Sequence, residues 1–144
     1  AMLDAAMSGP RTERVSHLRK ELQDSMMDNA SVFRTEETLT TQMQVLKQLR
    51  ERYRNIGVED KGKRFNTELM EAIELGFLLD NAQALVAAAL NRTESRGAHS
   101  REDYKERDDE NWLKHTMVYL EGDEVRIDYK PVTLGRYEPK PRVY

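Results

Sequence analysis

The sequence predicts an α+β domain that is mainly α-helical: a three-helix antiparallel bundle followed by a charged loop, a β-hairpin and an extended tail. Three observations lead to this prediction. Apolar residues recur at helical spacing through residues 11–91, a densely charged segment follows, and an alternating apolar pattern lies beside a glycine turn. The 144 residues fit one domain with a modest core. We divide it into a leader and linker at 1–10, the bundle at 11–91, and the loop, hairpin and basic tail at 92–144 of the same domain.

The first two helices are predicted from their apolar spacing and their start signals. In the first, which begins near Thr12, apolar residues recur at three- and four-residue steps, the spacing of one helix face. These residues are Val15, Leu18, Leu22, Met26, Ala30 and Phe33. The second helix starts at Thr35, because its hydroxyl can cap the helix and two glutamates follow at the positive end of the helix dipole. Gly57 is expected to stop it.

The third predicted helix starts at the cap sequence of residues 66–68, Asn-Thr-Glu. It differs from the other two because its apolar residues leave little polar face over three turns. Such a helix must be covered on several sides. We expect its two amphipathic neighbours to cover part of it, and a surface outside this chain to cover the rest.

A β-hairpin and a basic tail are predicted after the charged segment. Val125, Ile127 and Tyr129 alternate with charged residues, and the Glu-Gly-Asp sequence of residues 121–123 supplies the turn. Prolines and an excess of basic residues beyond Lys130 predict an extended segment that lies along another surface.

Composition excludes several classes of site and partner. The absence of cysteine rules out a disulfide framework, a thiolate zinc site, an iron–sulfur cluster and a cysteine nucleophile within this chain. A net charge of -3, with charged residues of both signs, does not favour nucleic acid as a partner. The longest apolar run, residues 84–90, is far shorter than the ~20 residues of a membrane span. The amino terminus lacks a signal-peptide pattern. We therefore expect a cytoplasmic location without direct membrane insertion.

Candidate chemical groups are few, and no catalytic, cofactor-binding or metal-binding residue is assigned. His17, His99 and His115 lack the spacing of metal ligands and a set of catalytic partners, so a surface or structural role is favoured for each. The acidic run at 108–110 lacks the spacing of a calcium loop, and we interpret it as a solvated turn or as partners for nearby arginines. Gly-rich phosphate-binding motifs are absent from the sequence.

Residues 94–104 are the most informative segment of the chain. Gly97 can adopt the left-handed conformation that turns the backbone after the third helix. The charged and aromatic side chains around it suit ion pairing to a neighbouring surface. We therefore predict a docking loop, formed by Arg96, His99, Arg101, Asp103 and Tyr104. The alternative is an exposed flexible linker. In the isolated chain we expect the docking loop to be looser than the bundle, and tight pairing of the loop with the bundle itself would count against a docking role.

Segment 94–104 resembles the carboxy-terminal domains of succinate dehydrogenase and fumarate reductase flavoproteins and, more loosely, of L-aspartate oxidase. Segments 107–116 and 128–132, together with the final four residues, are similar to the first two of these. The resemblance implies a parent flavoprotein that oxidises succinate to fumarate and passes electrons through FAD to an iron–sulfur subunit. It also implies that the flavin and substrate residues lie in other domains. This chain would then carry no cofactor and would pack against the flavin-binding domain of the same parent.

Three rival functions stay open at this point. The chain could be the tail domain of an L-aspartate oxidase, a free-standing helical adaptor that binds a partner through its charged loop, or a metal-dependent hydrolase. For the preferred reading, the resemblance implies a parent at the cytoplasmic face of the membrane, held there as a peripheral protein through its complex.

Overall fold

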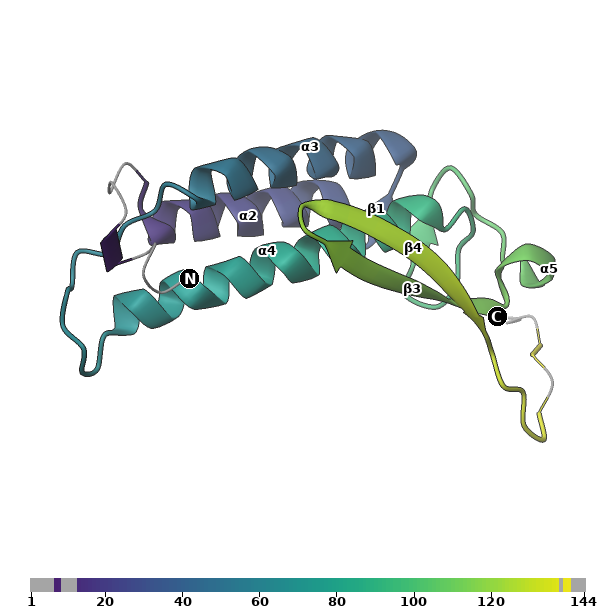
Figure 1. Cartoon of the computed structure of the whole chain (residues 1–144). Helices are drawn as coiled ribbons and strands as arrows, with labels where there is room; N and C mark the ends of the chain where they lie inside the picture. The colour runs from purple at the N-terminus through teal and green to yellow at the C-terminus, as the bar shows by residue number, and fades with distance from the viewer. Residues whose placement is uncertain (1–6, 9–12, 138, 141–144) are drawn as a thin grey trace.

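Figure 1 shows a computed structural model of the chain, which describes residues 7–8, 13–137 and 139–140. Three long helices lie side by side and form the predicted bundle: α2 (Val15–Ala30), α3 (Glu36–Tyr53) and α4 (Thr67–Asn91). The remaining elements are β1 (Phe33–Arg34), β2 (Ser100–Arg101), the short helix α5 (Asp109–Trp112), and the strands β3 (Lys114–Glu121) and β4 (Glu124–Pro131). The predicted fold class, mainly α with a small β component, is confirmed.

The core lies between the three long helices and is built mostly from leucine. Its fully buried members include Leu18, Leu39, Leu46, Leu49, Leu75 and Leu79. Their burial provides the main free energy of folding, at about 1.5–3 kcal/mol for each fully buried side chain. The polar residue Gln42 of α3 is also fully buried in this core. Its amide accepts a bond from the Asn29 amide and donates one to the Ser25 hydroxyl, both at 3.0 Å, so its polar atoms are satisfied.

Both predicted helix caps are present. At the start of α3, the Thr35 hydroxyl accepts from the Thr38 N–H at 3.2 Å, and the Thr38 hydroxyl accepts from the Thr35 N–H at 3.1 Å. This reciprocal pair satisfies two backbone donors that the helix itself leaves without a partner. At the start of α4, the side-chain oxygen of Asn66 accepts from the Leu69 N–H at 2.8 Å.

The ends of the first two helices differ from the sequence prediction. Phe33 does not continue the apolar stripe of the first helix, because α2 ends at Ala30 and Phe33 lies exposed in β1. There β1 pairs in parallel with β2, a contact between segments far apart in the sequence. Helix α3 ends at Tyr53, before Gly57, since the chain turns at residues 54–55 and then forms a bridge between Ile56 and Glu13.

The predicted hairpin is confirmed, and its strands extend one or two residues beyond the ranges 116–120 and 124–130 that the alternating pattern indicates. Strands β3 and β4 pair antiparallel in a register that places Val118 opposite Ile127, and Gly122 in the turn has a φ of 69°. Two contacts hold the hairpin to α4. The Gln83 amide donates to the Asp123 carbonyl at 3.0 Å, and the Tyr129 hydroxyl donates to Asn91 at 2.7 Å.

Helix α4 changes one expectation from the sequence. The absence of a membrane span was inferred from short uninterrupted apolar runs, yet this helix is long and apolar enough to cross a membrane on length and composition. It is the one such helix among the residues that the structure describes. A core helix passes the same test, and Ala72, Leu75 and Val86 of α4 are fully buried within the bundle.

Candidate functional site

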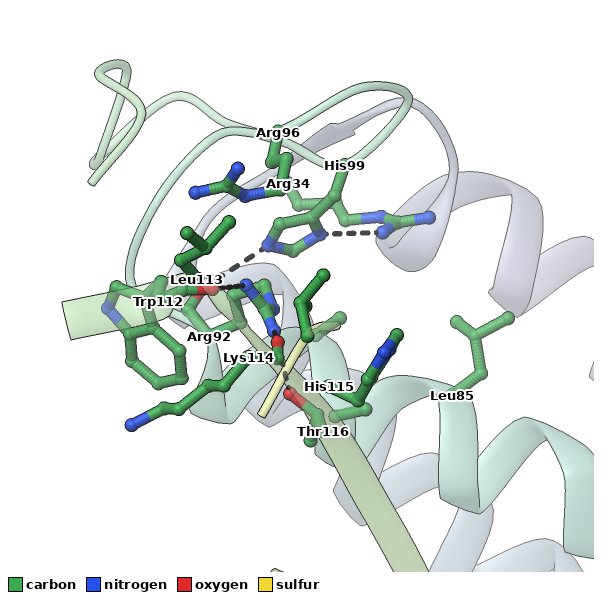
Figure 2. A pocket seen from close by; sticks show the side chains of 13 residues that line it. Arg34, Leu85, Arg92, Arg96, His99, Trp112, Leu113, Lys114, His115 and Thr116 are labelled. Atoms are coloured by element: carbon green, nitrogen blue, oxygen red, sulfur yellow. Dashed lines mark hydrogen bonds between the residues drawn. The ribbon is translucent and has the colours of Figure 1, made fainter. Parts of the chain in front are cut away.

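The charged loop packs against the carboxyl end of α4 and the amino end of α3, and its strand β2 pairs with β1. It borders a shallow pocket of about 600 Å³ (Figure 2). Side chains from β1, α4, the loop and β3 converge there. The polar and aromatic ones are Arg34, Arg92, Arg96, His99, Trp112, Lys114, His115 and Thr116. The pocket therefore joins segments that are separated by more than fifty residues in the chain.

Arg101 is the centre of the loop, and its side chain is buried inside this chain. Its residue is 1% exposed, and one guanidinium nitrogen donates to the carbonyls of Ala89 at 3.0 Å, Leu90 at 3.1 Å and Arg92 at 3.3 Å. Ala89 and Leu90 belong to the last turn of α4, whose carbonyls lack a partner within the helix, and Arg92 follows directly after it. A cation at this end also opposes the negative end of the helix dipole. Arg101 thus caps α4.

Asp103 links that cap to the start of α3. Its carboxylate accepts two bonds from Arg101, at 2.7 and 2.8 Å, and a third from the Glu36 N–H at 2.8 Å. The paired arginine is the main reason why the pKa of Asp103 falls to about 2, and the Glu36 N–H lowers it further. One carboxylate therefore connects the carboxyl end of α4 to the amino end of α3.

Glu94 organises the other half of the loop from a fully buried position. Its carboxylate accepts from Arg96 at 2.8 and 3.0 Å, from the Asp108 N–H at 2.9 Å, and from Arg92. Burial opposes the charged form of Glu94, but the bonds from Arg96, the Asp108 N–H and Arg92 together outweigh it, so its pKa is lowered. Arg96 also pairs with Asp109 at 2.7 Å. The buried charge is therefore compensated on several sides, as burial of a carboxylate requires.

His99 lies between Arg34 and the backbone of Arg92 (Figure 2). Its Nδ1 is 2.9 Å from an Arg34 nitrogen and its Nε2 is 3.3 Å from the Arg92 carbonyl oxygen. Because the guanidinium can only donate, Nδ1 is the acceptor and Nε2 carries the proton. Burial lowers the pKa of His99, and the charges of Arg34, Arg101 and Arg92 lower it further. A neutral ring with both nitrogens engaged holds two segments together and is not poised to transfer a proton.

Arg34 is a second helix cap that the sequence did not reveal. Its Nε donates to the carbonyls of Ser31 at 2.7 Å and Ala30 at 3.3 Å, at the end of α2. Arg92 also donates to backbone carbonyls, those of Trp112 at 2.9 Å and Lys114 at 2.5 Å, and so ties the end of α4 to the start of β3. For Arg34 the available signal was an arginine four residues after the end of a predicted helix. The sequence held no such signal for Arg92, because its acceptors lie in a later segment.

The structure brings together all five residues of the predicted docking loop, but it contradicts the expectation that the loop is looser than the bundle. The guanidinium of Arg101 and the carboxylate of Asp103 bond to the helix ends, and Arg96 is tied to Glu94. The central carbon of the Arg101 guanidinium lies 4.9 Å from the centroid of the Tyr104 ring, and Tyr104 is 40% exposed. Charged side chains that find partners in their own chain order a loop as firmly as apolar ones. This internal pairing counts against a docking role for the loop, and contact between these five residues and another domain stays an untested prediction.

The other candidate groups occupy positions that suit structural roles. His17 and His115 are exposed. Asp108 caps α5 through the Asn111 N–H at 3.0 Å, and Asp109 pairs with Arg96 and Arg107 at 2.7 Å each, in agreement with the interpretation of the acidic run as partners for arginines. Within the described part of the chain, no group of three His, Asp or Glu side chains could hold a metal ion.

Comparison with known proteins identifies a family. The family model described as fumarate reductase flavoprotein C-term matches residues 19–144. The fumarate reductase flavoprotein subunit of Mycobacterium tuberculosis is 42% identical over 137 residues, which cover 94% of this chain and 24% of that protein. The succinate dehydrogenase flavoprotein subunit of Rickettsia conorii is 47% identical over 121 residues, which cover 83% of this chain and 20% of that protein.

Solved structures give the same result. A chain of the E. coli quinol fumarate reductase matches with a TM-score of 0.93 and 34% identity, over 99% of this chain and 25% of that one. The chain therefore spans about a fifth to a quarter of the length of the relatives that it matches. The resemblance read from segments 94–104 and 107–116 is confirmed, and both branches of the family are among the relatives.

Proposed function

Because this chain belongs to the family of fumarate reductase flavoprotein carboxy-terminal domains, we propose that it is a non-catalytic module that packs against an FAD-binding domain in the same parent chain. The observation that carries this proposal is the match of nearly the whole chain to one quarter of a flavoprotein subunit. A segment of that size, with its own core and capped helices, can support a neighbouring domain without taking part in the chemistry.

The residues of the candidate site do not fit the flavin itself. The sequence holds no Gly-rich dinucleotide motif, and the guanidiniums of Arg92, Arg96 and Arg101 already bond to carbonyls or carboxylates of this chain. A phosphate group would have to displace those partners. We therefore assign FAD to the remainder of the parent, and we route no chemical step through the residues of this chain.

The parent, on this proposal, is an oxidoreductase that oxidises succinate to fumarate and delivers the electrons through FAD to an iron–sulfur subunit. The names of the relatives in both branches support this activity. The contribution of the present chain is to hold the shape of the flavin-binding part. The parent would lie at the cytoplasmic face of the membrane as a peripheral protein, attached through its complex.

Removal of this domain from the full-length flavoprotein tests the proposal. We expect the shortened protein to lose FAD content and succinate-dependent dye reduction, and we expect addition of the 144-residue chain to restore part of both. The 144-residue chain alone should be colourless and inactive. A shortened protein that keeps its flavin and its full activity would contradict the proposal.

The same assay separates the rival functions. Dye reduction that depends on L-aspartate and not on succinate would identify the parent as an aspartate oxidase. An absence of any effect of the added chain, together with capture of the chain by an unrelated protein, would favour the free-standing adaptor.

A further inference from the structure

One face of helix α4 leaves a row of large apolar side chains exposed. Met70, Phe77, Leu78 and Leu85 are each between 39% and 59% exposed. Met70 and Leu85 are each seven or eight residues from the adjacent pair Phe77 and Leu78. The four therefore lie on one side of the helix, away from the buried Leu75 and Val86. A soluble surface rarely carries a row of this kind without a partner.

The loop before α4 extends this row with a fully exposed aromatic residue. Phe65 is 100% exposed and has a φ of 52°, a left-handed conformation that is costly for a residue with a side chain. The loop is held in place around it: the Asn66 amide donates to the carbonyls of Asp60 at 2.7 Å and Gly62 at 3.0 Å. The loop therefore fixes an aromatic side chain in the solvent at a cost in backbone energy, as occurs at binding surfaces.

We infer that the parent's flavin-binding domain packs on this surface, from Phe65 to Leu85, and that Phe65 is the anchor residue of the contact. The inference rests on the proposed function and specifies which face of the chain makes the contact. About three quarters of the length of each relative lies outside the matched segment, so a large body of the same polypeptide is available to cover the row. From Met70 to Leu85 the row spans about 22 Å at 1.5 Å per residue, a length that suits the contact between two domains.

The charges around the anchor define the chemistry of the opposing surface. Lys63 and Arg64 are exposed next to Phe65. An apolar socket rimmed with carboxylates would match this combination, because it would bury the ring and pair with the cations at its edge. At the other end, Leu85 borders the pocket beneath the charged loop, so the loop adjoins this face without forming its centre.

Photocrosslinking in the full-length flavoprotein tests the inference. Phe65 and Phe77 are each replaced by p-benzoylphenylalanine, which reacts with C–H bonds within a few ångströms, and the products are mapped by mass spectrometry. Phe33 is the matched control, because it is an equally large side chain, 69% exposed, on a different element. Tyr104 reports on the charged loop. We expect crosslinks from positions 65 and 77 to the flavin-binding part of the same chain, and none from position 33.

Other patterns would overturn the inference, and they differ from one another. Crosslinks from position 104 with none from 65 or 77 would make the charged loop the contact and leave the proposed function intact. Crosslinks from 65 and 77 to a second copy, seen as a product of twice the mass, would make this face a self-association surface. An absence of crosslinks from all four positions would contradict the proposed function as well.

Discussion

Among single residues, Arg101 has the largest structural role outside the apolar core. Its buried side chain joins three carbonyls at the end of α4 to the carboxylate of Asp103, which in turn reaches the first turn of α3. Removal of one partner from a buried ion pair leaves the other charge uncompensated, and this costs more than the pair itself contributes.

Arg101→Ala should therefore destabilise the chain by about 3–5 kcal/mol. Denaturation by urea, followed by circular dichroism, measures the loss. Arg54→Ala is the control, because Arg54 also pairs with an aspartate but its side chain is 59% exposed, and we expect a change below about 1 kcal/mol. An equal loss in the two variants would show that burial gives Arg101 no special role.

Asp103 makes the free energy of unfolding depend on pH in the acidic range. Its folded pKa of about 2 lies below the ordinary value of 3.8, so folding favours the ionised carboxyl. The stability from this group is fully present above about pH 4 and is lost as the pH falls from there toward 2. Asp103→Asn should lower the free energy of unfolding at pH 6 and reduce its fall between pH 4 and pH 2. A fall as steep as that of the unchanged chain would contradict this role.

The bonds of Arg101 to the end of α4 could not be predicted from the sequence, whereas the helix cap at Thr35 could. A cap of Thr35 depends on residues three positions apart, which the sequence shows directly. The bonds of Arg101 depend on a return of the chain to the end of α4, eleven or twelve residues earlier. The composition of a charged segment does not show whether its side chains face solvent or bond to backbone carbonyls.

At the scale of the elements, α4 is positioned by a single asparagine at its start. Asn66 accepts from the Leu69 N–H with its oxygen and donates to two loop carbonyls with its nitrogen. It therefore sets both the first turn of the helix and the conformation that exposes Phe65. The sequence predicted the cap, but the two carbonyl bonds depend on how the loop at residues 58–65 folds back.

Asn66→Ala should cost at least about 1 kcal/mol, which is typical for loss of a helix cap, and more if the loop carbonyls find no other partner. It should also weaken the crosslink from position 65, because the loop would no longer be held. Thermal unfolding measures the first effect. Asn81→Ala is a suitable control, since Asn81 is exposed on α4 and bonds to a carbonyl within its own helix. A loss in Asn81→Ala as large as that in Asn66→Ala would count against the cap.

For the whole molecule, the apolar character of α4 connects sequence, fold and function. The sequence predicted that this helix needs cover on several sides. The structure covers it with α2 and α3, and with the hairpin along its carboxyl half, and leaves the row from Met70 to Leu85 exposed. The fold class and all three long helices were predicted, because helical spacing is a local property. The pairing of β1 with β2 and the order of the charged loop were not, since both depend on contacts between distant segments.

Calorimetric titration of the 144-residue chain into the flavin-binding portion of the parent tests the central claim most directly. We predict saturable binding with a negative heat-capacity change, because the contact buries the apolar face of α4. Phe77→Ser should weaken binding at least tenfold, while Phe33→Ser, at the matched exposed position, should leave it unchanged. An absence of binding, with the intact parent active under the same conditions, would contradict the account.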